Sequence, residues 1–217
     1  MQFSTASTGP RDSWSPWFRL IVFILAFVSF ACLLGQFYRL WTMHFFACWV
    51  LPPATALLAW IAYATRRQPG GVHCPKTWIV EGALGGIVAA VAYDLYRLPF
   101  VLNGAPLFKV FPQFGQLILG ANEPLWLVQL LGWTYHFSNG AALGIMFLAL
   151  VWRATPRILF WGAVAWALFI EAMLLLTPYT GFFGLRINGR FLFLTASAHL
   201  VFGLVLGAWC RRRLRVI

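Results

Sequence analysis

The stretch GWTYHFSNGAALGIMF, residues 132–147, places polar side chains inside a long apolar segment. That segment, residues 124–152, is long enough to cross a hydrocarbon core about 30 Å thick, which takes about 20 helical residues. Four polar side chains interrupt it: Tyr135, His136, Ser138 and Asn139. Because a polar group at membrane depth is costly unless it is paired, the cluster indicates either a contact inside a helical bundle or a functional site.

The composition assigns the chain to the membrane proteins. Of its 217 residues, 61% are hydrophobic and only 10% are charged, whereas about 25% of the residues of a soluble domain are charged. The net charge of +11 would favour nucleic-acid binding on a soluble domain. On a membrane protein it first reports topology, so we expect the lipid bilayer as partner and no nucleic acid.

Six apolar segments predict an all-α, six-helix transmembrane domain over residues 16–210. They show no alternation with a period of two, which excludes the strands of a membrane barrel. Residues 1–15 are expected to be a disordered cytoplasmic N-terminus and residues 211–217 a basic cytoplasmic tail. The predicted spans are residues 20–38, 44–64, 78–99, 124–152, 158–178 and 191–210.

The basic residues predict that both termini are cytoplasmic. The N-terminus, the second and fourth loops and the C-terminus carry eleven of them, and the opposite side carries five. The five are Arg39, Arg97, Lys109, Arg186 and Arg190. Arginine outnumbers lysine fourteen to two, which is typical of a GC-rich bacterial genome, so we expect a multi-pass protein of a bacterial inner membrane.

A repeated pattern links the fourth and sixth segments. HxxxGxxxG begins at His136 and again at His199, and residues at this spacing share one face of a helix. The preceding segments each carry an acid, Asp94 before Pro99 and Glu171 before Pro178, and were expected to end at those prolines. The third to sixth helices therefore read as two tandem hairpins, each with an acidic helix followed by a histidine helix.

The four ionisable residues of these hairpins are predicted to meet. At 1.5 Å per helical residue, all of them lie between roughly 7 and 18 Å from the outer surface. Such residues inside a membrane mark function by default. We expect one enclosed pocket that opens to the periplasm, formed by Asp94, His136, Glu171 and His199.

Three chemistries suit this set. Two imidazoles and two carboxylates suit Zn, Mn or Fe, with Tyr135 and Asn139 orienting the ligands. The two histidines are alternatively axial ligands of haem b, with Arg186 or Arg190 at its propionates. Without any cofactor, Asp94 or Glu171 acts as a general acid. In the enzyme reading, Arg97, Arg186 and Arg190 attract a lipid-like or anionic substrate.

Simpler interpretations remain open from the sequence. Asp94 and Arg97 are three residues apart, so one alternative is that they serve only as an intrahelical ion pair. The polar residues also suit a proton- or cation-coupled transporter, or a non-catalytic scaffold whose bundle they lock. Whether the protein is an enzyme, and its oligomeric state, stay open.

Two further features bear on the architecture. Residues 100–123 are apolar and interrupted by glycine and proline, so they form either a re-entrant lid or a helix on the membrane surface. The four cysteines show no CxxC spacing. A Cys32–Cys48 disulfide is conceivable, but buried single thiols are the preferred interpretation.

Overall fold

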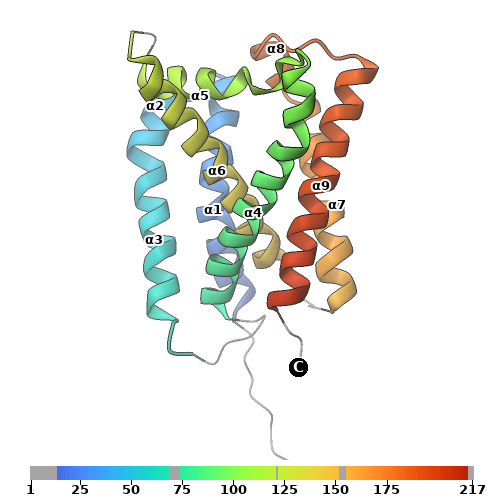
Figure 1. The fold of residues 1–217 in the computed structure, drawn as a ribbon. Helices are drawn as coiled ribbons and strands as arrows, with labels where there is room; N and C mark the ends of the chain where they lie inside the picture. Colours follow the sequence, from blue (N-terminus) through green and yellow to red (C-terminus); the bar gives the residue numbers. More distant parts are fainter. Residues whose placement is uncertain (1–13, 69–73, 121, 152–154, 215–217) are drawn as a thin grey trace, which may run out of the picture.

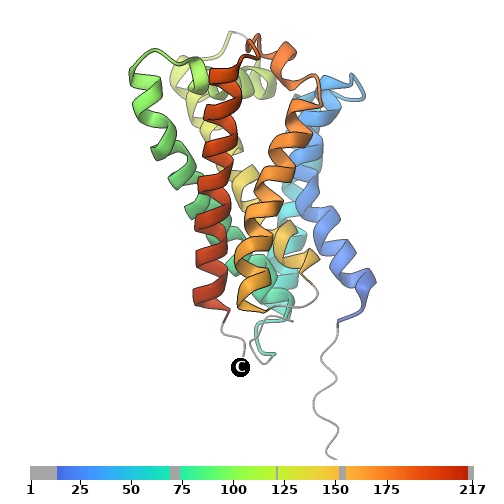
Figure 2. The same cartoon turned by 90° about the vertical axis from the view of Figure 1, so that its right-hand side faces the viewer.

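The computed structural model describes residues 14–68, 74–120, 122–151 and 155–214. The described chain is all-helical, with 83% of its residues in helices and no strands. Long helices lie side by side (Figure 1). The short helices α5 and α8 lie at one end of the bundle, here named the outer end. Helix α1 begins and helix α9 ends at the opposite, inner end (Figure 2).

Each of the six predicted segments forms a long helical run. The second run is interrupted by a π-helical turn, and three short elements connect the others. The long runs are α1 (Pro16–Phe37), α2–η1–α3 (Met43–Phe45, Phe46–Val50 and Leu51–Ala64), α4 (Pro75–Leu102), α6 (Leu125–Leu150), α7 (Pro156–Leu175) and α9 (Gly189–Arg213). The short elements are η2 (Pro106–Phe108), α5 (Val110–Leu119) and α8 (Tyr179–Phe182).

Five of these runs are long and apolar enough to cross a membrane: α1, Met43–Ala64, α4, α7 and α9. Helix α6 has 26 residues but is not among the five. Its polar cluster around His136 lowers its mean hydropathy, yet α6 packs against α1, α4 and α5 in the centre of the bundle. The fold is therefore that of a helical membrane protein with several spans.

Two predicted helix ends were wrong. Helix α4 continues through Pro99 to Leu102: the proline removes a single amide donor, and the Asn103 amide still donates to the Pro99 carbonyl. Helix α7 ends at Leu175, before Pro178, since a residue that precedes proline is disfavoured in helical geometry.

The two ends of the chain are also partly different from the prediction. Residues 1–13 and 215–217 lie outside the described residues. Within the predicted N-terminal segment, Ser15 caps α1 by accepting a hydrogen bond from the Trp17 amide. Within the predicted tail, Arg211–Arg213 still belong to α9, where basic residues favour the negative end of the helix dipole.

Glycines hold both hairpins together at backbone distance. A Cβ placed on Gly86 of α4 would lie 2.0 Å from the Gly140 carbonyl oxygen of α6, and one on Gly144 would lie 2.0 Å from the Gly82 oxygen. In the second hairpin, a Cβ on Gly203 of α9 would lie 2.7 Å from the Val164 Cα of α7. The glycines of both HxxxGxxxG stretches therefore face the preceding long helix of their hairpin.

Within the predicted segment 100–123, helix α5 (Val110–Leu119) lies across the outer end of the bundle (Figure 1). Helix α5 contacts α6 closely, since a Cβ on Gly115 would lie 1.9 Å from the Val128 oxygen, and one on Gly132 would lie 1.9 Å from the Phe111 oxygen. The side chains of Phe111 and Phe114 are buried beneath it. The segment thus covers the bundle interior from the outer side.

The cysteines of the described chain are all free. Cys32, Cys74 and Cys210 are buried, as the preferred interpretation predicted, whereas Cys48 is exposed on η1. The helical run that contains η1 is little buried inside the bundle, so a thiol there meets the surroundings rather than the core.

Candidate acid–base site

The polar cluster of α6 points in two directions. Tyr135, Ser138 and Asn139 face α1, where all three contact Ser29. The Tyr135 hydroxyl donates to the Ser29 carbonyl at 2.8 Å, and the Ser29 hydroxyl donates to Asn139 Oδ1 at 2.9 Å. His136 instead faces α4. Most of the cluster therefore forms hydrogen bonds between α6 and α1, whereas His136 belongs to a different site.

The first acidic pair joins α4 to α6. His136 Nε2 lies 2.8 Å from Asp94 Oδ2, and Arg97 Nη1 lies 3.4 Å from Asp94 Oδ1. Arg97 also donates to the carbonyl of Leu107, and its guanidinium lies 4.6 Å from the centroid of the Tyr93 ring. The intrahelical Asp94–Arg97 pair anticipated from the spacing is present, but it is one part of a larger buried network.

The second acidic pair joins α7 to α9. His199 Nδ1 lies 3.0 Å from Glu171 Oε2 and 2.9 Å from the Thr195 carbonyl. Both Glu171 and His199 are buried. In each hairpin, therefore, the histidine that precedes the glycines binds the acid of the preceding long helix.

These contacts fix which ring nitrogen carries the proton. A carbonyl oxygen only accepts hydrogen bonds, so His199 Nδ1 is the donor, and its Nε2 is unprotonated when the ring is neutral. His136 donates from Nε2 to Asp94, which leaves its Nδ1 unprotonated. Each imidazole is thus oriented by a carboxylate and has a basic nitrogen free of that contact.

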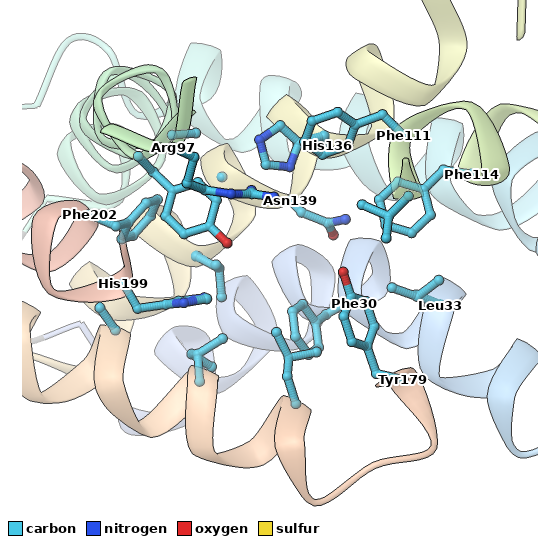
Figure 3. Close-up of a pocket in the computed structure, with 18 of the residues that line it drawn as sticks. Phe30, Leu33, Arg97, Phe111, Phe114, His136, Asn139, Tyr179, His199 and Phe202 are labelled. Atoms are coloured by element: carbon cyan, nitrogen blue, oxygen red, sulfur yellow. The ribbon is translucent and has the colours of Figure 1, made fainter. Parts of the chain in front are cut away.

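Both histidines line one cavity of about 100 Å³ (Figure 3). Tyr93 contacts both imidazole rings, with its ring centroid 5.0 Å from that of His199 and 6.3 Å from that of His136. Aromatic side chains form much of the wall, and Asn139, Arg97 and Tyr179 add polar groups. The aromatic residues that line the cavity are Phe30, Tyr93, Phe111, Phe114, Trp166, Tyr179 and Phe202.

The other predicted site residues lie in different places. Glu171 lines an adjacent cavity of about 40 Å³ rather than the larger one. Arg186 and Arg190 line a groove of about 380 Å³ at the outer end, formed with the loops that flank η2 and α9. Tyr135 bonds α1 and does not line the large cavity. Instead of the predicted single cluster, the structure has two acid–histidine pairs beside a shared cavity. Arg186 and Arg190 lie at the separate outer groove.

Sequence reasoning missed three residues of the site. Tyr93 contacts both histidine rings, Ser29 bonds the polar face of α6, and Tyr179 lines both cavities. Burial raises the pKa of Tyr179 above its ordinary value, so its hydroxyl remains a neutral hydrogen-bonding group. Tyr93 directly precedes Asp94 and lies one turn from Arg97, which was the available signal.

Within residues 14–68, 74–120, 122–151 and 155–214, no group of three or more His, Cys, Asp and Glu side chains is placed to hold a metal ion. No protein-family model, curated protein or solved structure matches the chain. Its function must therefore be argued from the geometry of the two pairs and the cavity.

Proposed function

We propose that the protein is a membrane-embedded enzyme whose cavity performs acid–base chemistry on a small, largely apolar ligand. The observation that carries the proposal is that His136 and His199, each bonded to its own carboxylate, line the same cavity. An imidazole held in one tautomer by a carboxylate is the arrangement used by general bases in many enzymes. Each ring takes a proton from a bound ligand or returns one.

The size and the wall of the cavity support this class of ligand. The cavity of about 100 Å³ is partly open, so a ring of the size that fills an engineered, closed cavity of about 150 Å³ in another protein can enter it. Aromatic walls favour an apolar ring or the end of a lipid-like molecule. Asn139 and Tyr179 supply hydrogen bonds to a polar atom of that ligand.

The inner half of the bundle favours an enzyme over a transporter. Beneath the cavity, α4 and α6 touch through Gly82 and Gly144, and the side chains of Trp78, Leu148 and Leu206 are fully buried. A transporter needs a path to both faces of the membrane. The described residues of the inner half form a close-packed core instead.

The proposed topology has six spans, which are the five candidate spans and α6. Both termini lie in the cytoplasm of a bacterial cell. Support comes from the excess of basic residues on one side and from α1 beginning and α9 ending at the same end of the bundle. The groove near Arg186 and Arg190 then faces the periplasm and offers an anionic or lipid-like substrate its approach.

Phenol, a ring with one acidic hydroxyl, tests the proposal in lipid nanodiscs. We expect phenol to shift the ring ¹⁵N NMR signals of His136 and His199 saturably, while the signal of His44, which bonds the Ile118 carbonyl outside the cavity, stays constant. His136→Gln or His199→Gln should weaken binding by roughly fivefold or more, since each removes a charge-assisted partner. His44→Gln is the matched control. Saturable shifts at neither ring would contradict the proposal.

Metal and haem readings of the same residues are tested on the same sample by elemental analysis and an optical spectrum. We favour the cofactor-free site because no three His, Cys, Asp or Glu side chains of the described residues are placed to hold a metal ion, and because a porphyrin is several times larger than benzene. Stoichiometric Zn, Mn or Fe that is lost in the double variant His136→Ala/His199→Ala would replace this proposal with a metal enzyme. A Soret band lost in that variant would replace it with a haem protein.

A further inference from the structure

A second cavity of about 40 Å³ adjoins the first one and reaches toward the outer end. Tyr93, Arg97, Tyr179 and His199 line both cavities. The smaller one is lined in addition by Glu171. It therefore lies between the two acid–histidine pairs, touching Glu171 of one pair and Arg97, which holds Asp94 of the other.

Two buried polar atoms on this cavity lack partners. Among the described residues, Glu171 Oε1 and Arg97 Nε are buried and have no hydrogen-bond partner in the protein. Leaving such an atom unsatisfied costs about 1–3 kcal/mol, and more for a charged group. One atom is an acceptor and the other is a donor, so a single type of small polar molecule can satisfy both.

The dimensions of the cavity suit water. A buried water molecule needs about 10–15 Å³ of such volume and two to four polar partners, so about 40 Å³ accommodates a few molecules. Glu171 Oε1 is an acceptor for a water hydrogen, and Arg97 Nε–H is a donor to a water oxygen. The hydroxyl groups of Tyr179, Thr180 and Thr195 also belong to residues that line the cavity.

The cavity also adjoins the outer groove. Leu107, Leu185 and Phe191 line both the 40 Å³ cavity and the 380 Å³ groove, so a single layer of apolar side chains separates them. On the inner side, the described residues form a buried apolar core. Exchange of water with the outside is therefore directed to the outer end.

We propose that this cavity is a hydration site that joins the two acid–histidine pairs and exchanges water with the outer groove. Arginine keeps its proton at physiological pH, so Arg97 orients the water and does not relay protons. The water chain reaches the Glu171 carboxylate. Through its contact with His199 Nδ1, this carboxylate exchanges hydrogens between the water and the imidazole ring. The Glu171–His199 pair thus communicates with the outer face through the smaller cavity, which Asp94 and His136 do not line. The inference deepens the proposed function, because this water supplies and removes the protons of the catalytic cavity.

Hydrogen exchange of the two ring N–H groups, followed by NMR after transfer of nanodiscs into D₂O, tests the inference. In the unsubstituted protein, we expect the His199 Nδ1–H to exchange roughly tenfold or more faster than the His136 Nε2–H, because Glu171 and His199 line the hydrated cavity and Asp94 and His136 do not. Thr195→Leu fills the cavity and should slow the exchange at His199 by roughly tenfold. Thr195→Val, which keeps the size of the side chain, should leave the rate within about twofold.

Leu185→Phe provides a second variant. Its larger side chain thickens the apolar layer between the 40 Å³ cavity and the groove, and the sequence of α9 is unchanged. It should slow exchange at His199 in the same direction, and this variant decides the question if Thr195→Leu does not fold. Equal exchange at both rings, or rates at His199 that neither Thr195→Leu nor Leu185→Phe slows, would overturn the inference. The measurement uses no phenol, so its failure is distinct from a failure of the proposed function.

Discussion

Replacing Asp94 with leucine should lower the free energy of unfolding by about 3–5 kcal/mol, the range measured when one partner of a buried ion pair is removed. Arg97 would then be a buried cation whose carboxylate is gone, and His136 would lose the acceptor 2.8 Å from its Nε2. Unfolding followed by circular dichroism in a mixed detergent series measures the change. No other carboxylate of the described chain bonds both an arginine and a histidine.

A double substitution separates the lost pairing from the lost charge. Asp94→Leu/Arg97→Met removes both charges and should recover a large part of the stability, because apolar replacements of buried ion pairs are often neutral. Glu123→Leu, at an exposed position outside the bundle core, should change stability by less than about 0.5 kcal/mol. If the double variant were as unstable as Asp94→Leu, a buried unpaired Arg97 would not be the cause.

Replacing Gly86 with alanine should destabilise the protein by about 3 kcal/mol or more, at the upper end of the cost of overpacking. The new Cβ would lie 2.0 Å from the Gly140 carbonyl oxygen, which is backbone and cannot turn away. Helices α4 and α6 must then separate, and this movement also withdraws Asp94 from His136. We therefore expect a lower unfolding temperature together with loss of the phenol response at His136.

Gly181→Ala is the matched control for this substitution. Gly181 also lies in a helix, but a Cβ there would have no atom within 4 Å, so its replacement should leave stability and both histidine signals unchanged. Equal effects at Gly86 and Gly181 would show that helix propensity, rather than the contact between α4 and α6, controls the outcome.

Helical periodicity predicted the helix faces that carry the two pairs. His136 and His199 each stand one turn before a glycine, and the glycine faces the preceding long helix of the hairpin, so the histidine faces that helix too. The acids at Asp94 and Glu171 lie on those helices. Hydrophobicity in turn predicted the six long helical runs, although α6, whose polar cluster reduces its hydropathy, is not among the five candidate spans.

Periodicity could not predict distances across the bundle. It predicts the face of each helix but not the spacing between hairpins. The sequence therefore predicts one cluster of four ligands, whereas the structure has two separate acid–histidine pairs. The place of α5 over the cavity depends on the contacts of Gly115 and Gly132 with backbone far away in sequence. The bond from Arg97 to the Leu107 carbonyl likewise needs the turn after α4, which apolar patterning does not specify.

The second helical run, Met43–Ala64, has only 17% of its most apolar window buried inside the protein, compared with 44% for α1 and for α4. In a bilayer, we expect the tilt of this run to follow bilayer thickness more readily than that of the other helices, because little of it is held by the rest of the protein. Among the described residues, none that lines the three cavities belongs to this run. Membranes of different thickness should thus tilt Met43–Ala64 while the geometry around the two histidines stays constant.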